Sequence, residues 1–234
     1  MKTRKKWEYD EMQQVGTDYE DPRQVEIYDR RMSKFRDIEK ENAQTFHSVG
    51  LKNDHVVLEI GTGTGELAIG AARRCRRVYA VDVSPAMLKC AAAKARKRGV
   101  GNITFVHAGF LTYEHKGLPI DTVVSKAALH HLPDFWKMAA LKRIHRILKP
   151  CGRLYLGDIV FDFPIESYQQ GIDEWIGQFE KKTDSTMAAS AALHVKKEYS
   201  TFDWIIDGML RRTGFSIKRC IKTSFFASYL CVKR

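Results

Sequence analysis

The chain has 234 residues and a mass of 26.9 kDa, enough for one large α/β domain or two small ones. Its 44% hydrophobic and 29% charged residues are an ordinary balance for a soluble globular protein. No apolar run reaches the roughly 18–20 residues that a membrane-spanning helix needs. The start, MKTRKKWEYDEM, lacks the apolar core of a secretory signal. We therefore expect neither a membrane protein nor a secreted one.

The cysteines, histidines and net charge limit the cellular compartment, metal sites and partners that we expect for this protein. Five cysteines are an odd number and none form a CxxC pair, which argues against a disulfide framework or zinc site and favours a reducing cytoplasm. The histidines show no HxxxH spacing, so we expect no metal. The formal net charge of +11 permits a nucleic-acid partner. Its basic clusters, however, end predicted helices, where cations face the negative pole of the helix dipole.

Strands and helices alternate from residue 55 onward. Apolar runs predict five strands, and the segments between them carry helix signals such as Ser84 as an N-cap, Pro85 in the first turn and Gly99 beyond the end. A third helix stops before Pro150. The predicted strands are 55–60, 77–83, 102–108, 120–127 and 152–161, and the predicted helices are 65–75, 84–99 and 134–148.

Regular alternation of this kind implies parallel strands joined by right-handed crossovers. Residues 162–200 interrupt it, and apolar residues there recur at helical spacing, which predicts a helical insertion. After one more helix ending at Gly214, two strands at 215–221 and 225–232 are too closely joined for a parallel crossover. The predicted fold is α/β, a doubly wound Rossmann-like sheet of seven strands, mostly parallel, with an antiparallel last strand and helices on both faces.

A glycine-rich turn, EIGTGTG, joins the first strand to its helix at residues 59–65. A dinucleotide-binding fingerprint would place its third glycine at position 66, where this chain has Glu66. Asp82 lies 21 positions after Gly61, at the end of the second strand. A carboxylate there faces the crevice of the sheet and can accept hydrogen bonds from both hydroxyls of a ribose.

These motifs resemble those of the class I S-adenosylmethionine-dependent methyltransferases, and most closely the small-molecule branch known as the methyltransferase domain 11 type. The resemblance rests on VLEIGTGTGELA, VYAVDVSPAML, IDTVVSKAALHHL and LKPCGRLYLGDI, and it covers residues 55–161. In the last motif Cys151 replaces a glycine of the usual LKPGG. The resemblance implies one methyltransferase domain over 1–234, an N-terminal lid or helical segment at 1–50 and a helical cap over the substrate at 162–200.

The resemblance also implies a cofactor, S-adenosyl-L-methionine, and a set of residues that bind it. The glycine loop would lie against the methionine part, Glu59 would hold its ammonium group, and Asp82 would bind the ribose. Val83 and Met87 would flank the adenine. The cofactor-binding residues that we expect are Tyr28, Glu59, Gly61, Thr62, Gly63, Gly65, Asp82, Val83, Met87, Gly109, Phe110, Ser125 and Lys126.

One departure from the family concerns the adenine. Related chains often have a Gly-Asp pair after the third strand, and the aspartate accepts a hydrogen bond from the adenine amino group. This chain reads Ala108-Gly109-Phe110, so the aspartate is missing. The backbone N–H of Phe110 is still available to the adenine.

His130 and His131 follow the fourth strand, at the carboxyl edge where open α/β sheets bind ligands. They are the candidate catalytic residues, either as a general base or as groups that orient the substrate. The alternative is structural: one caps the turn and the other packs.

Three functions from different classes are compatible with these features. The leading one is methyl transfer to a small molecule through oxygen, nitrogen or sulfur. A methyltransferase that acts on RNA or protein is the alternative, motivated by the charge of +11. The third is a protein that binds the cofactor without catalysis. The sequence leaves the acceptor and the oligomeric state open.

Overall fold

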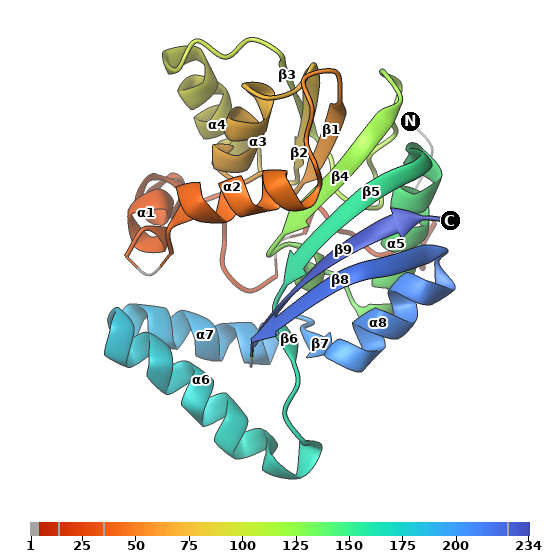
Figure 1. Cartoon of the computed structure of the whole chain (residues 1–234). Coiled ribbons are helices and arrows are strands. Elements are labelled where there is room, and N and C mark those ends of the chain that lie inside the picture. The colour runs from red at the N-terminus through yellow and green to blue at the C-terminus, as the bar shows by residue number, and fades with distance from the viewer. Residues whose placement is uncertain (1–4, 14, 35, 224) are drawn as a thin grey trace.

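The computed structural model describes residues 5–13, 15–34, 36–223 and 225–234 (Figure 1). Strands and helices alternate as the sequence predicts, and the predicted α/β fold is confirmed. Helices are α1 (Pro22–Met32), α2 (Ile38–Ser48), α3 (Glu66–Ala72), α4 (Pro85–Lys97), α5 (Asp134–Ile147), α6 (Tyr168–Lys182), α7 (Ser185–Lys197) and α8 (Asp203–Arg212). Main-sheet strands are β1 (Val56–Ile60), β2 (Arg77–Asp82), β3 (Ile103–His107), β4 (Ile120–Lys126), β5 (Leu148–Asp158), β8 (Phe215–Thr223) and β9 (Phe226–Lys233).

The main sheet has seven strands in the order β3-β2-β1-β4-β5-β9-β8. The first five are parallel, and β9 pairs antiparallel with both β5 and β8. The antiparallel last strand is therefore confirmed. Ser224, in the connection between β8 and β9, lies outside the described residues.

Alternate residues of the central strands build two cores, one on each face of the sheet. Val57, Val78 and Ala80 pack with α2 and α3 on one face. Leu58 and Ile60 face the other side, where they join the core formed with α5 and α8. Both faces are covered, so β1 is buried at every position, as expected of a central parallel strand.

The predicted strand 152–161 differs from the structure at both ends. It begins at Leu148, directly after α5, and it divides at Ile159 into β5 and the short strand β6 (Val160–Phe161). The N–H of Ile159 donates to Oδ1 of Asp158 (2.7 Å), which turns the chain away from the sheet. β6 then pairs with β7 (Thr201–Phe202), and both lie apart from the main sheet.

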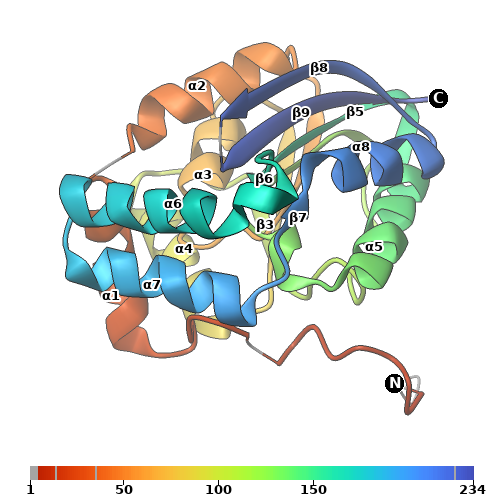
Figure 2. The same ribbon diagram turned by 90° about the horizontal axis from the view of Figure 1, so that it is seen from below.

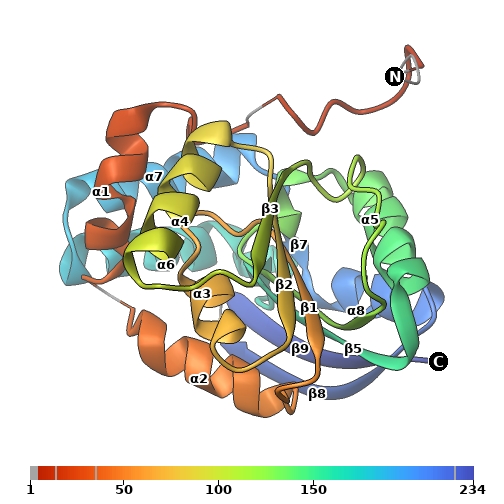
Figure 3. The same ribbon diagram turned by 90° about the horizontal axis from the view of Figure 1, so that it is seen from above.

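The segments outside the sheet gather at the carboxyl ends of the parallel strands. The predicted helical insertion consists of α6 and α7, which pack against each other below the strand ends, with α1 close by (Figures 1 and 2). The N-terminal segment runs past this end of the molecule before α1 (Figures 2 and 3). This edge is where a doubly wound sheet binds its ligands.

Candidate functional site

The glycine loop and Asp82 form a rigid unit at the tips of β1 and β2. Gly61 has φ of +80°, and a Cβ there would lie 2.4 Å from Cβ of Ala128, so only glycine fits. The N–H of Gly63 donates to Oδ2 of Asp82 (2.7 Å), and the N–H of Ser84 donates to Oδ1 (2.9 Å). Burial raises the pKa of Asp82, and these two donors oppose that shift. The carboxylate is thereby fixed beside the loop.

A cleft opens between this unit and the loop after β3. Its walls combine the Asp82 carboxylate with apolar surface from Val83, Met87 and Phe110. The structure brings nine of the predicted cofactor residues to this cleft, and His131 lies at its edge. These nine are Tyr28, Gly61, Gly63, Asp82, Val83, Met87, Gly109, Phe110 and Lys126.

Glu59 and Thr62 line an adjoining groove that shares Gly61, Gly63 and Lys126 with the cleft. The hydroxyl of Thr62 donates to Oε2 of Glu59 (2.8 Å). Glu59 is 4% exposed, and burial raises its pKa to about 8. A ligand ammonium group beside this carboxylate would favour its ionised form. The Glu59 carboxylate is therefore a suitable hydrogen-bond acceptor for the ammonium group of a methionine moiety.

Two predicted cofactor residues, Gly65 and Ser125, line neither the cleft nor the adjoining groove. Gly65 faces α4, and a Cβ there would lie 2.7 Å from Cβ of Ala91, so this glycine permits helix packing. The hydroxyl of Ser125 is buried and donates to the carbonyl of Ile60 (2.9 Å). Both residues support the site through contacts in the protein interior.

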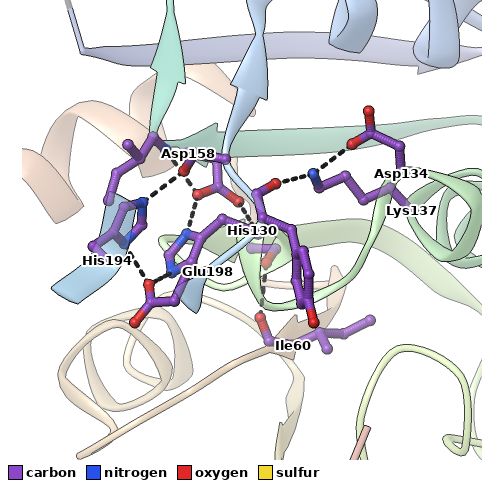
Figure 4. A network of polar contacts seen from close by, with 11 residues as sticks. Ile60, His130, Asp134, Lys137, Asp158, His194 and Glu198 are labelled. Atoms are coloured by element: carbon purple, nitrogen blue, oxygen red, sulfur yellow. Dashed lines mark hydrogen bonds and ion pairs between the residues drawn. The ribbon is translucent and has the colours of Figure 1, made fainter. Parts of the chain in front are cut away.

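His130 lies at the centre of a buried network of charged groups (Figure 4). Its Nδ1 lies 2.5 Å from Oδ1 of Asp158, and its Nε2 lies 3.2 Å from Oε2 of Glu198. Nδ1 of His194 contacts the same oxygen of Glu198, and its Nε2 lies 2.7 Å from the hydroxyl of Ser200. The network joins the loop after β4 to the tip of β5 and the end of α7.

The two predicted catalytic histidines differ in protonation state near neutral pH. Burial alone would lower the pKa of His130, but the carboxylates of Asp158 and Glu198 outweigh it and raise that pKa to about 9. Burial and the neighbouring charge of His130 lower the pKa of His131 to about 3. His130 is therefore cationic and His131 neutral, with their ring centres 4.4 Å apart.

The same cluster has the composition of a metal site. His130, His131 and Glu198 each place one potential ligand atom within 4.8 Å of the others. HxxxH spacing is absent because the ligands come from two distant segments. Both ring nitrogens of His130 contact carboxylates, so the arrangement is an ion-pair network as it stands.

A second cavity, of about 690 Å³, adjoins the cleft at Tyr28, Lys126 and Ala127. It lies between the N-terminal segment and the insertion, at the carboxyl ends of β4 and β5. Its volume is typical of small-ligand sites. We call it the acceptor cavity. Its lining includes Tyr19, Tyr28, Arg31, Arg36, Tyr155, Trp175, Phe179, Met187, Phe225 and Phe226.

Sequence reasoning missed four acidic and histidine side chains at this edge: Glu11, Asp158, His194 and Glu198. Asp158 ends the predicted fifth strand, a position that indicates a ligand-facing carboxylate. His194 and Glu198 stand four residues apart near the end of a helix, so they share a face. Glu11 carries no local signal.

Comparisons with known proteins give one consistent family. A family model described as a methyltransferase domain matches residues 57–152. An uncharacterized methyltransferase of Geobacillus kaustophilus is 30% identical over 206 residues, which cover 82% of this chain and 92% of that relative. The uncharacterized methyltransferase YrrT of Bacillus subtilis is 36% identical over 118 residues, or 50% of this chain and 53% of YrrT.

Solved structures agree at the level of the fold. A SAM-dependent methyltransferase from Aquifex aeolicus superimposes with a TM-score of 0.64 at 18% identity, over 92% of this chain and 99% of that one. Magnesium protoporphyrin IX methyltransferase from Synechocystis, solved with S-adenosylhomocysteine, gives 0.60 at 22% identity, over 84% and 82% of the two chains. Among the described residues, none of the helices has the length and apolar character to cross a membrane.

Proposed function

Because this chain belongs to the class I S-adenosylmethionine-dependent methyltransferases, we propose that its methyl acceptor is a small molecule bound in the acceptor cavity. The observation that carries the proposal is the position of that cavity, which meets the cleft at Tyr28, Lys126 and Ala127. The N-terminal segment and α6–α7 line it from two sides. An acceptor in this place would lie between these segments, next to the cleft.

The cofactor would occupy the cleft and the adjoining groove. Asp82 would bind the ribose hydroxyls, Val83 and Met87 would flank the purine, and Glu59 would face the ammonium group. S-adenosylmethionine supplies an electrophilic methyl group on a sulfonium that leaves as a neutral thioether. The protein then mainly has to align the nucleophile with that methyl group, a contribution of about 7–11 kcal/mol in favourable cases.

We assign an orienting role to His131 and a positioning role to His130. With a pKa of about 3, His131 is a weak base. It lines the cofactor cleft and not the acceptor cavity, so it would offer a hydrogen bond to the acceptor only where the two spaces meet. With a pKa of about 9, His130 already holds its proton and cannot take another from an acceptor. Its contacts to Asp158 and Glu198 fix the loop that carries His131. Neither histidine is then suited to deprotonate the acceptor, which favours an acceptor that is already nucleophilic, such as a neutral amine or a thiolate.

The acceptor cavity also suggests the character of its ligand. Aromatic side chains dominate its wall, and Arg31, Arg36 and Lys126 reach it, the last two paired with Glu41. A partly apolar molecule with a polar group fits this lining. All five cysteines are free thiols, which suits the cytoplasmic location that we propose.

Calorimetry with S-adenosylhomocysteine and NADH tests the cofactor assignment. We expect S-adenosylhomocysteine to bind and NADH not to bind. Asp82→Asn should weaken binding at least tenfold, because a hydrogen bond to a charged carboxylate contributes about 1.5–3 kcal/mol. Asp54→Asn, in an exposed loop, is the matched control and should bind like the wild type. Binding of NADH alone would overturn the assignment.

The acceptor class is tested with methyl-labelled S-adenosylmethionine. The enzyme is offered cell extract that has been separated into metabolites below about 3 kDa, RNA and protein. We expect label in the metabolite fraction. Label in RNA, together with RNA affinity that falls steeply with salt, would instead favour a nucleic-acid substrate and a role for the +11 charge.

A further inference from the structure

Glu11 is a buried carboxylate in the wall of the cofactor cleft that comes from outside the sheet. Its residue is only 8% exposed, and it lines the cleft together with Gly109 and Phe110. It belongs to the N-terminal segment, a hundred residues away in sequence from the loop that it touches. A carboxylate is rarely buried without a specific partner or task.

The loop after β3 holds this carboxylate firmly. Oε1 accepts hydrogen bonds from the backbone N–H of Leu111 (2.8 Å), the N–H of Thr112 (2.6 Å) and the hydroxyl of Thr112 (2.7 Å). Among the described residues, Oε2 accepts one hydrogen bond, shared with Oε1, from the N–H of Leu111 (2.9 Å). Burial raises the pKa of Glu11, and these donors oppose the shift. Oε2 therefore keeps capacity for a further donor.

The position of the carboxylate coincides with that of a side chain missing from the loop. A Cβ built on Gly109 would lie 2.5 Å from both Cδ and Oε2 of Glu11. A short acidic side chain at position 109 and the carboxylate of Glu11 would thus compete for one space. In the Gly-Asp pair that the resemblance leads us to expect after β3, Ala108 takes the place of the glycine and Gly109 takes the place of the aspartate that contacts adenine.

We propose that Glu11 accepts the hydrogen bond from the exocyclic amino group of the cofactor's adenine, in place of an aspartate at position 109. The proposal rests on the proposed function, because it requires S-adenosylmethionine in the cleft. Glu11 and Phe110 line the same cleft as Asp82, Val83 and Met87, so a purine whose ribose is bound to Asp82 would lie within reach of both. An amino group there would donate to Oε2, whereas a keto oxygen would place two hydrogen-bond acceptors against each other.

Calorimetry on the full chain with two ligands tests this assignment. S-inosylhomocysteine differs from S-adenosylhomocysteine by a keto oxygen in place of the amino group and a proton on N1. The wild type should prefer S-adenosylhomocysteine by at least tenfold. Glu11→Gln should reduce that preference at least tenfold, because its amide can rotate to donate to the keto oxygen. The control Glu8→Gln, at a half-buried carboxylate in the same segment that accepts from the N–H of Lys5 and does not line the cleft, should keep the wild-type ratio.

The outcomes separate this inference from the proposed function. If the wild type binds neither ligand, the proposed function fails. If it binds S-adenosylhomocysteine and Glu11→Gln keeps the wild-type ratio, Glu11 only anchors the segment and the inference is wrong. Should Glu11→Gln fail to fold, the double variant Glu11→Ala/Gly109→Asp replaces it. The single variant Glu11→Ala is measured beside it: Glu11→Ala should lose the preference for the adenine ligand and the added aspartate should restore it, whereas a preference kept by Glu11→Ala would overturn the inference.

Discussion

At the scale of single residues, Cys151 departs from the family motif and has a backbone conformation that favours glycine. It is exposed and has φ of +59°, in the left-handed region that disfavours any residue with a Cβ. The resemblance predicts glycine at this position. The turn between α5 and the paired part of β5 thus keeps a glycine conformation without the glycine.

Cys151→Gly should stabilise the protein by about 0.5–1 kcal/mol. Removing the Cβ relieves a left-handed strain of about 1–2 kcal/mol, and the greater freedom of glycine in the unfolded chain offsets part of that gain. Urea denaturation measures the free energy of unfolding. Cys151→Ala keeps a Cβ and should change it by less than about 0.5 kcal/mol. A Cys151→Gly protein less stable than Cys151→Ala would contradict the argument.

At the scale of elements, the cap formed by α6 and α7 depends on Trp175 for its attachment. This side chain is 6% exposed, stacks on Phe225 with ring centres 5.6 Å apart, and contacts Phe179 and His194. Phe225 lies next to the start of β9, so the stack joins the cap to the sheet. A change at Trp175 should therefore weaken the contact between the cap and the sheet without changing the sheet itself.

Trp175→Leu should loosen the cap and leave the cofactor cleft unchanged, since Trp175 lines only the acceptor cavity. In hydrogen exchange, we expect the amides of α6 and α7 to exchange at least tenfold faster, with no change in β1 and β4. The affinity for S-adenosylhomocysteine should change less than twofold. Trp204→Leu, at a side chain that is 69% exposed, serves as control. Equal acceleration in both variants would refute the role of the stack.

At the scale of the whole molecule, the histidine network should make stability depend on pH in two directions. The pKa of His130 is raised to about 9, so its stabilising effect is full below pH 6.5 and is lost as the pH rises through 9. The pKa of His131 is lowered to about 3, so the unfolded chain binds the extra proton below pH 6.5 and stability falls with acid. The combined contribution of these two rings to stability should therefore be greatest near pH 6.5.

His131→Asn should flatten the acid side of this profile. Between pH 6.5 and 4.5 the wild type should lose about 1–3 kcal/mol of unfolding free energy from this ring. The variant should lose less, while His47→Asn, an exposed ring at the end of α2, should behave like the wild type. Urea denaturation at several pH values measures the difference. An unchanged acid slope in His131→Asn would show that other groups cause the loss.

The sequence by itself determined the order of strands and helices, the antiparallel last strand and most of the residues that line the cleft at the tips of β1 and β2. These features follow from local signals: apolar runs, the Ser84 cap, the glycine turn, and Asp82 at a strand end. Each acts over a few residues, so it can be read along the chain. The helical structure of residues 162–200 is predicted in the same way, from the spacing of its apolar residues.

Only the tertiary structure decided which distant side chains meet at the site. Glu11 reaches the loop at Leu111, and His130 meets Glu198, across 100 and 68 positions of sequence. Gly65 and Ser125 conversely carry the expected motif but face the protein interior. The docking of the N-terminal segment and α7 against the sheet edge fixes these contacts. Such docking depends on packing between whole elements, for which no short stretch of sequence holds the information.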